Sequence, residues 1–272
     1  MAPTVGIVSP GAMGSALADA LDTRVVATLE GRGERTRTLA GRAPRLELLP
    51  TLDDVVRASD VVLCVAPPGE AEAIAARVPD ARLYADLNAI APDTVRRISP
   101  DVDGSISGPP PWEAGTTRVY LSGPRAAEVA SLPWLRVEVV VVGDEIGSAS
   151  AVKMCTASVY KGTVALLAHA LLTAQANGVL RHVLDDLGEL AEGSGRAIAS
   201  ATTKSARYVP EMQEIAATQA AAGLPRELFD GVAAVYEALS RRGLASATPE
   251  DVPRELDAEE ALRLLTSGGR PS

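Results

Sequence analysis

Residues 6–21, GIVSPGAMGSALADAL, decide the fold that we expect for this chain. They read as a strand, a tight turn and a helix, and the turn SPGAMG has the spacing G-x-G-x-x-G with Ser9 in place of the first glycine. In this spacing Gly11 lets a pyrophosphate approach the backbone, Gly14 lets the helix pack close to the strand, and the N–H groups of the helix start face the anion. Glycines also occur in other strand-to-helix turns, but the position before a plausible second strand favours a dinucleotide site. Its predicted residues are Ser9, Pro10, Gly11, Ala12, Met13 and Gly14.

The end of the second expected strand indicates which dinucleotide is bound. A carboxylate there accepts hydrogen bonds from the ribose hydroxyls of NAD, whereas an arginine favours the additional phosphate of NADP. The segment LEGRGERTR (29–37) offers Glu30 for NAD and three arginines for NADP. We expect NADP(H) rather than NAD(H), with Arg32 nearest to the 2'-phosphate, and we expect Arg35 and Arg37 to lie on a solvated surface.

The first half of the chain alternates short apolar runs with segments of helical pattern. Runs that are apolar on both faces and separated by helices indicate a parallel sheet covered on both sides. Because ligands bind at the carboxyl ends of such strands, Ala66, Pro67, Asn88 and Ser107 are candidates for the site, although Asn and Ser also cap local turns. The expected strands lie within residues 4–9, 24–29, 60–66, 82–87, 104–107, 118–123 and 137–143.

The second half has a different pattern. No proline occurs between Pro133 and Pro210, and apolar residues recur at helical spacing from residue 152 to residue 178. Further helices are expected downstream, one of them starting at Pro210, and the last residues, SGGRPS, resemble a disordered tail. We therefore predict a Rossmann-like, doubly wound α/β domain over residues 1–143 and an all-helical domain over residues 144–272.

Composition excludes several classes of function. The formal net charge of −9 argues against a nucleic-acid partner, and 3% aromatic residues argue against base stacking. Two cysteines, Cys64 and Cys155, are too few for a disulfide framework, and no Cys/His cluster has metal-ligand spacing, so no metal is expected. The first residues lack a basic leader followed by an apolar stretch, and no 18 apolar residues run together. We expect a soluble, cytoplasmic protein without a membrane partner.

Three motifs resemble the superfamily of 6-phosphogluconate dehydrogenase, the β-hydroxyacid dehydrogenases and the imine reductases. DLNAIAP (86–92) is similar to their Asp-x-Ser-Thr-Ile-x-Pro segment, with Asn88 for the serine, and DGSISGP (103–109) is similar to the substrate loop Asp-Ala-Pro-Val-Ser-Gly-Gly, with Ser107 and Gly108 matching. KMCTASVYKG (153–162) resembles the catalytic helix Lys-Met-Val-His-Asn-Gly-Ile-Glu-Tyr-Gly. The resemblance implies a Rossmann-like cofactor domain, a helical domain that dimerises, and substrate contacts from Asn88, Ser107 and Gly108.

The chain is most similar to a branch of NAD(P)-binding oxidoreductases whose C-terminal domain is of unknown function. Members of this branch have Lys-Met followed eight residues later by Lys-Gly, here Lys153 and Lys161, and a downstream segment like EMQEIAAT (211–218). That resemblance makes Glu211 and Met212 candidates for the substrate pocket. Lys161 is a candidate for contact with the substrate, the cofactor or the opposite subunit. Where 6-phosphogluconate dehydrogenase has its asparagine and its acidic proton donor, this chain has Ala157 and Tyr160, which argues against decarboxylating sugar-phosphate oxidation.

Lys153 and Tyr160 are the candidate catalytic residues. On a helix, Lys153, Ala157 and Tyr160 share one face. An ammonium group directed at a reacting oxygen supplies both a field and a proton, and we assign this role to Lys153. Tyr160 is a candidate second proton donor or a residue that orients the substrate.

We therefore expect an NADPH-dependent oxidoreductase that transfers a hydride between the nicotinamide and a small polar carbonyl or hydroxy compound, carrying a carboxylate. The expected partners are this small-molecule substrate and a second copy of the chain, bound through the helical domain. One alternative is an imine reductase acting on C=N, although many of those enzymes lack the lysine. A different class of alternative is a non-catalytic NAD(P)-binding sensor, which the alanine at position 157 leaves open.

Overall fold

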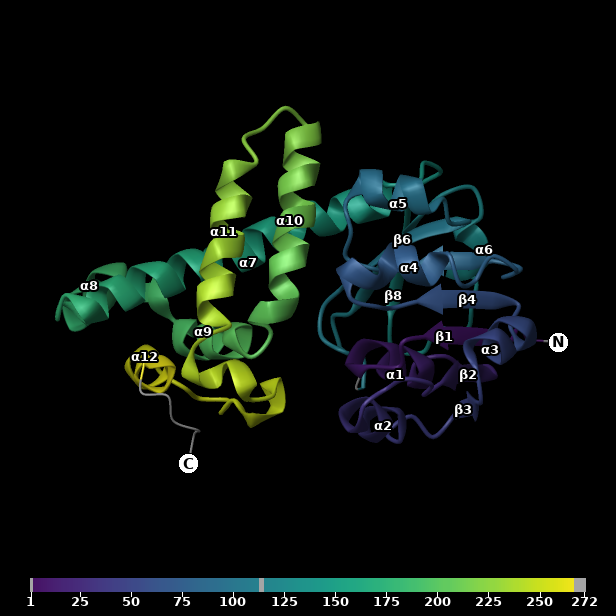
Figure 1. Ribbon diagram of the computed structural model, residues 1–272, viewed down its shortest axis with the longest axis horizontal. Helices are drawn as coiled ribbons and strands as arrows, with labels where there is room; N and C mark the ends of the chain where they lie inside the picture. Colours follow the sequence, from purple (N-terminus) through teal and green to yellow (C-terminus); the bar gives the residue numbers. More distant parts are fainter. Residues whose placement is uncertain (1, 113–114, 267–272) are drawn as a thin grey trace. The chain divides into compact units, whose positions relative to one another are not determined.

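The computed structural model describes residues 2–112 and 115–266 and divides the chain into two compact units, Met1–Met154 and Cys155–Ser272 (Figure 1). The predicted domain boundary at residues 143/144 coincides with the end of the last strand, β8 (Glu138–Gly143). The boundary between the two compact units lies 11 residues later, inside the long helix α7 (Ser148–Ala176). The predicted disordered tail, residues 267–272, lies outside the described residues.

The first unit is built on one sheet. Within its described residues the strand order is β3-β2-β1-β4-β5-β6-β7-β8, and neighbouring strands are parallel except β6 and β7. Successive side chains of a strand point to opposite faces, and both faces are covered: Ile7 and Leu63 share a core with residues of α1 and α6, while Val8 and Cys64 share another with residues of α3 and α4. The remaining strands are β1 (Val5–Val8), β2 (Val25–Thr28), β3 (Leu46–Leu49), β4 (Val61–Cys64), β5 (Tyr84–Asp86), β6 (Val102–Ser107) and β7 (Arg118–Ser122).

Short helices connect these strands. Most begin directly after a strand, as a parallel sheet requires, and Thr51 caps α3 by accepting a hydrogen bond from the Asp54 N–H at 3.1 Å. The helices of this unit that precede α7 are α1 (Ala12–Asp19), α2 (Glu34–Ala40), α3 (Leu52–Ala58), η1 (Pro68–Glu70), α4 (Ala71–Ala75), α5 (Pro92–Ile98) and α6 (Ala126–Ala130).

Two features of the sheet differ from the prediction. Strand β3 was not expected, because it is a four-residue edge strand with a charged Glu47 at its second position and partly exposed leucines. Strand β7 runs antiparallel to β6, with Gly104 opposite Leu121. The link between them spans residues 108–117, too short for the crossover that a parallel pair needs.

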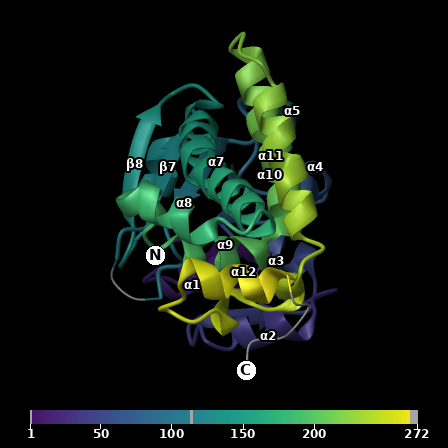
Figure 2. The same ribbon diagram turned by 90° about the vertical axis from the view of Figure 1, so that its left-hand side faces the viewer.

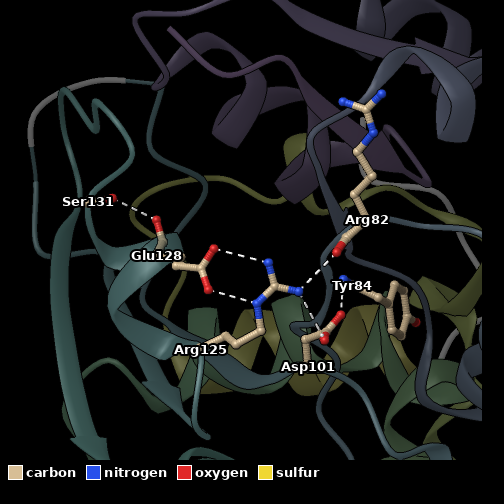
Figure 3. A network of polar contacts seen from close by, with 6 residues as sticks. All are labelled: Arg82, Tyr84, Asp101, Arg125, Glu128 and Ser131. Atoms are coloured by element: carbon tan, nitrogen blue, oxygen red, sulfur yellow. Dashed lines mark hydrogen bonds and ion pairs between the residues drawn. The ribbon is translucent and has the colours of Figure 1, made fainter.

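A network of ion pairs and hydrogen bonds closes the amino ends of β5 and β6 (Figure 3). The Arg125 guanidinium pairs with both carboxylate oxygens of Glu128, with Asp101 at 3.1 Å and with the backbone carbonyl of Arg82 at 2.9 Å. Asp101 also accepts a hydrogen bond from the Tyr84 N–H at 2.8 Å. Arg82 and Asp101 precede β5 and β6, whereas Arg125 and Glu128 follow β7, which is antiparallel to β6. The network therefore lies at the edge of the sheet opposite to the carboxyl ends of the parallel strands, and its role is structural.

The second unit is helical, as predicted. Helices α10 and α11 form an antiparallel pair joined by a short loop (Figure 1), and α9 packs against α12 (Figure 2). At that contact a Cβ on Gly195 would lie 2.2 Å from the backbone of Asp257, so only glycine fits there. Its helices after α7 are α8 (Leu180–Leu187), η2 (Gly188–Ala191), α9 (Ser194–Thr202), α10 (Ser205–Ala221), α11 (Glu227–Leu239), η3 (Gly243–Ser246), η4 (Pro249–Asp251) and α12 (Ala258–Thr266).

The prediction of a helix start at Pro210 is wrong, because α10 begins at Ser205 and continues through this proline. Proline removes the hydrogen bond to the carbonyl four residues earlier, that of Ala206. Ala206 is exposed, so water can satisfy its carbonyl. Glu211 therefore lies seven residues into α10 and not in a first turn.

Helix α7 is long and apolar enough to cross a membrane when judged by length and composition alone. Its most apolar 18 residues have a mean hydropathy of 1.2, and 22% of them are buried. Core helices of soluble proteins pass the same test, but they are mostly buried. Because only 22% of this window is buried, much of the apolar surface of α7 is left exposed by this chain.

Candidate functional site

The glycine turn has the backbone geometry of an anion site. Ser9 has a φ of 68°, in the left-handed region, and its carbonyl accepts a hydrogen bond from the Gly11 N–H at 2.8 Å. Gly11 is the N-cap of α1, and no side chain among the described residues caps this helix. The first N–H groups of α1 have no partner within the helix, so they could bind an anion at the carboxyl end of β1.

The two glycines of the turn have different surroundings. A Cβ on Gly14 would lie 2.5 Å from the Ser9 carbonyl oxygen and 3.2 Å from Ile7 Cγ2, whereas a Cβ on Gly11 would meet no described atom within 4 Å. Gly14 thus permits the contact between α1 and β1, as predicted. The space beside Gly11 is open, so a dinucleotide pyrophosphate could approach the backbone there.

Charged side chains of the loop after β2 lie near charged side chains of the segment after β4. Arg32 Nη1 lies 3.9 Å from Glu70 Oε2, and Arg77 Nη2 lies 3.9 Å from Glu30 Oε2. The Leu52 N–H also donates to Glu30, at 3.4 Å. The Glu30 carboxylate is therefore drawn towards Arg77 and Leu52, while Arg32 has a long contact with an exposed carboxylate.

Asn88 joins the carboxyl ends of β4 and β5. Its side-chain oxygen accepts a hydrogen bond from the Ala66 N–H at 2.6 Å, and its amide nitrogen donates to Asp86 Oδ2 at 3.0 Å and to Cys64 Sγ at 3.3 Å. Only 2% of Asn88 is exposed. These contacts place Asn88 behind the loop that starts at Ala66 and Pro67, where it fixes the loop backbone. Direct contact of Asn88 with a cofactor or substrate stays a prediction.

Three titratable groups are buried beneath this loop. Burial raises the pKa of the Asp86 carboxyl to about 6, against the hydrogen bonds from Asn88 and Tyr84 that favour its ionised form, and the charge of Asp103 adds to the increase. Burial likewise raises the pKa of the Cys64 thiol to about 12 and that of the Tyr84 hydroxyl well above its usual range. Cys64 and Tyr84 are therefore neutral near pH 7, and neither is an activated nucleophile or base.

Asp86 makes the stability of the first unit depend on pH. Its pKa is about 6 in the folded chain and 3.8 for an unperturbed carboxyl, so its contribution is fully present below pH 3.8 and is lost as the pH rises through about 6. We expect the free energy of unfolding of the wild type, relative to Asp86→Asn, to fall by up to about 3 kcal/mol between about pH 4 and pH 7. Urea denaturation across this range measures it, and parallel curves for the two proteins would contradict it.

Lys153 lies at the same edge of the sheet. It is in the first part of α7, within the first compact unit, and its Nζ donates a hydrogen bond to the Ile106 carbonyl at 2.8 Å. Ile106 directly precedes Ser107 and Gly108, at the carboxyl end of β6. Gly108 has a φ of 114°, and a Cβ there would lie 2.9 Å from Thr117 Cα, so the loop requires glycine. The structure thus brings the predicted catalytic lysine to the predicted substrate loop.

The other predicted pocket residues lie in the second unit. Lys161 forms an ion pair with Glu211, which is buried, and its Nζ lies 4.2 Å from the centre of the Tyr208 ring. Met212 is fully buried. The side chain of Tyr160 is directed to solvent in this unit, since 72% of the residue is exposed. Lys161 and Glu211 are brought together, whereas Tyr160 and Met212 are not part of this cluster.

Two residues of this cluster were missed by sequence reasoning. The Tyr208 ring packs edge-on against Tyr236 at 5.2 Å, and the Tyr236 hydroxyl donates to the Lys161 carbonyl at 2.8 Å. Burial raises the pKa of Tyr208 to about 12. Tyr208 precedes Glu211 by three residues, the spacing of neighbours on a helix, but the expected helix start at Pro210 concealed that relation.

Comparisons with known proteins define the class of this fold. Residues 174–239 match a domain of unknown function, DUF1932. The conserved protein MTH1747, itself of unknown function and described as structurally similar to 3-hydroxyacid dehydrogenases, is 28% identical, with a TM-score of 0.63 over 87% of this chain and 96% of that chain. No curated protein matches the sequence significantly.

Two enzymes of known chemistry share the fold at lower identity. The 3-hydroxyisobutyrate dehydrogenase of Mycobacterium tuberculosis, solved with L-serine, is 18% identical, with a TM-score of 0.64 over 98% of this chain and 100% of that chain. The reductive aminase of Aspergillus terreus, solved with NADPH and ethyl levulinate, is 17% identical, with a TM-score of 0.54 over 89% and 94%. The resemblance to the hydroxyacid dehydrogenase and imine reductase superfamily is thereby confirmed at the level of the fold.

Proposed function

We propose that the protein is an NADPH-dependent oxidoreductase that transfers a hydride between the nicotinamide and a small polar carbonyl or hydroxy compound carrying a carboxylate. The observation that carries the proposal is the position of Lys153 in the same unit as the glycine turn. The turn follows β1 and the Lys153 amine lies at the end of β6, so both are at the carboxyl edge of one sheet. The hydroxyacid dehydrogenase fold supports the same assignment.

The choice of lysine at position 153 supports proton transfer. The sequence has 26 lysines and arginines together, and the lysines are Lys153, Lys161 and Lys204 alone. A guanidinium cannot release its proton in a protein, whereas an ammonium group can. In a chain in which nearly every cationic side chain is an arginine, the residue at the predicted substrate loop is thus the one whose cation can act as both acid and base.

The chemistry of the chain follows from this geometry. NADPH supplies the hydride. As negative charge develops on the carbonyl oxygen, the Lys153 ammonium stabilises it and donates the proton that completes the hydroxyl group; in the reverse direction the neutral amine accepts that proton. The Ile106 carbonyl accepts a hydrogen bond from Nζ and so fixes the direction of the side chain. The same arrangement would protonate the nitrogen of an imine, so C=N compounds belong in the substrate screen.

Calorimetric titration of the protein with NADPH and with NADH tests the cofactor assignment. We expect NADPH to bind about 10- to 100-fold more tightly than NADH, the effect of charge-assisted hydrogen bonds of about 1.5–3 kcal/mol from Arg32 to the 2'-phosphate. Arg32→Ala should abolish this preference. The matched control is Arg37→Ala, at an exposed arginine of helix α2. Preference for NADH would instead assign the site to Glu30. Failure to bind either at millimolar concentration would refute the oxidoreductase assignment.

The exposed face of α7 supports a homodimer formed through the helical unit. A groove of about 490 Å³ runs between α7 and α11, and its apolar lining includes the exposed side chains Val159, Leu166 and Leu228. A second copy of the chain would cover this face. Light scattering should give twice the chain mass of 28.1 kDa for the wild type and one chain mass for Leu166→Glu. Leu190→Glu, at an exposed leucine outside the groove, should remain dimeric, and a monomeric wild type would contradict the proposal.

A further inference from the structure

Asp103 is a buried carboxylate to which the resemblance assigns no role. It is the second residue of β6 and is 0% exposed. Its Oδ2 accepts hydrogen bonds from the Gly147 N–H at 2.9 Å, the Ser150 N–H at 3.1 Å and the Ser122 hydroxyl at 3.0 Å, and its Oδ1 accepts one from the Ser150 hydroxyl at 2.7 Å. A charge without water is held in a protein only by such a set of donors.

Three of these four bonds come from the start of α7, and the fourth comes from Ser122 on β7. The carboxylate lies at the positive end of a 29-residue helix and satisfies N–H groups that have no intrahelical partner. Two serines of the sheet complete the attachment, since Ser122 Oγ accepts from the Ala149 N–H at 3.0 Å and Ser105 Oγ donates to the Ala149 carbonyl at 2.7 Å. The start of α7 is therefore bonded to β6 and β7 by groups that are all buried.

Lys153 lies one helical turn beyond this attachment. Ser150, which makes two of the bonds to Asp103, precedes Lys153 by three residues and so lies on a neighbouring part of the same helix face. Asp103 in turn precedes Ile106, the acceptor of the Lys153 hydrogen bond, by three residues of β6. One strand and one helix are thus joined at two successive points, the Asp103 carboxylate and the Lys153 amine.

We propose that Asp103 is the positioning residue for Lys153: its buried carboxylate fixes the start of α7 on β6 and thereby holds the Lys153 amine at the Ile106 carbonyl. Asp103 does not touch the reacting groups. The role of Lys153 in proton transfer rests on the proposed function, but its placement by Asp103 can be measured without activity.

The lysines of the chain provide the experiment. The purified protein is labelled with a limiting amount of an amine-reactive acetylating reagent at fixed pH, and mass spectrometry gives the rates at Lys153, Lys161 and Lys204 in the same sample. In Asp103→Asn the amide can keep the shape of the hydrogen-bond set, with Ser150 Oγ reversed to accept, but the charge is lost. Ser150→Ala removes only the bond to Oδ1. Ser148→Ala, at a neighbouring serine of the same turn, is the matched control.

In Asp103→Asn we expect labelling of Lys153 to become about threefold faster or more, the effect of about 0.7 kcal/mol or more lost from its placement, while Lys161 and Lys204 change little. Ser150→Ala should act in the same direction with a smaller effect, and Ser148→Ala should match the wild type. Unchanged labelling of Lys153 in the folded variants would overturn the proposal, as would equal changes at all three lysines, which indicate general loosening. If Asp103→Asn does not fold, Ser150→Ala decides by the same criteria.

Turnover distinguishes this proposal from the proposed function. If the wild type reduces a substrate with NADPH, Asp103→Asn should lower kcat while the Kd for NADPH stays unchanged, because the glycine turn is untouched. If the wild type binds no dinucleotide, the proposed function fails, and the labelling rates still decide whether Asp103 places Lys153.

Discussion

Lys153→Met is expected to lower kcat by about 10²–10⁴-fold, the usual contribution of a positioned general acid or base. Methionine keeps the length and the apolar part of the lysine side chain but has no proton to donate. Lys153→Arg restores the positive charge, but a guanidinium is too weak an acid to give up a proton, and this variant is expected to rescue little of the loss. Stopped-flow measurement of NADPH oxidation with the best substrate of a keto-acid, aldehyde and imine screen gives the rates.

Two controls make this result specific to the amine. Calorimetric titration of Lys153→Met with NADPH should give the wild-type Kd, because the dinucleotide contacts lie at the glycine turn. Lys204→Arg, which removes a lysine whose Nζ bonds to Ser200 Oγ in the helical unit, should retain full turnover. Turnover of Lys153→Met within about threefold of the wild type would exclude lysine as the acid. It would also leave the non-catalytic sensor as the better interpretation if NADPH still bound.

Gly11→Ala is expected to weaken NADPH binding, whereas Gly14→Ala is expected to lower the stability of the fold. Gly11 has a φ of −73°, which alanine accepts, and its Cβ would enter open space. Gly11→Ala should therefore fold with an unchanged Tm, but its methyl group would occupy the position of the pyrophosphate and weaken NADPH binding about tenfold or more, at least 1.4 kcal/mol.

Gly14→Ala should act on the fold itself. The added Cβ would lie 2.5 Å from the Ser9 carbonyl oxygen, a backbone atom that cannot turn aside as a side chain does. Overpacking of this kind costs about 1–3 kcal/mol, partly offset by the helix propensity of alanine, about 1 kcal/mol. Thermal unfolding should show a lowered Tm for Gly14→Ala and an unchanged Tm for Gly11→Ala.

Gly231→Ala is the matched control, because a Cβ at this helical glycine meets no described atom within 4 Å. It should leave NADPH binding unchanged; because Gly231 lines the groove proposed to take the second copy, it is a control for binding only. Equal losses of stability in Gly11→Ala and Gly14→Ala would contradict the separate roles of the two glycines.

Much of the fold follows from local pattern. The run from Val5 to Val8 predicts a strand buried on both faces, and the spacing of Gly11 and Gly14 predicts the turn after it, because each depends on neighbours in the sequence. Edge strand β3 was not predicted, because Glu47 interrupts its short apolar run. Its strand conformation is stabilised by pairing with β2, which is a tertiary contact. The antiparallel direction of β7 was not predicted for a similar reason, because strand direction depends on the partner strand.

The candidate site was predicted less completely than the fold. The motif containing Lys153 identified the amine, but its contact with the Ile106 carbonyl joins residues 47 positions apart. The contact of Asn88 with a ligand stays a prediction, and its hydrogen bonds to Ala66, Asp86 and Cys64 were not foreseen, because they join two strands and the loop after β4. Tyr208 and Tyr236 carried no motif. They meet each other and Lys161 because three helices, α7, α10 and α11, come together there.

The sequence by itself determined most of the elements and their order, the change from an α/β half to a helical half, and the candidate groups for chemistry, since these follow from residue spacing and side-chain type. The tertiary structure decided which of these groups meet: Asp103 with the start of α7, Lys153 with the substrate loop, and Lys161 with Glu211 and Tyr208. The physical reason is that hydrogen bonds and ion pairs act over a few ångströms. The distances between residues far apart in the chain are set by the packing of helices and strands, which no local pattern encodes.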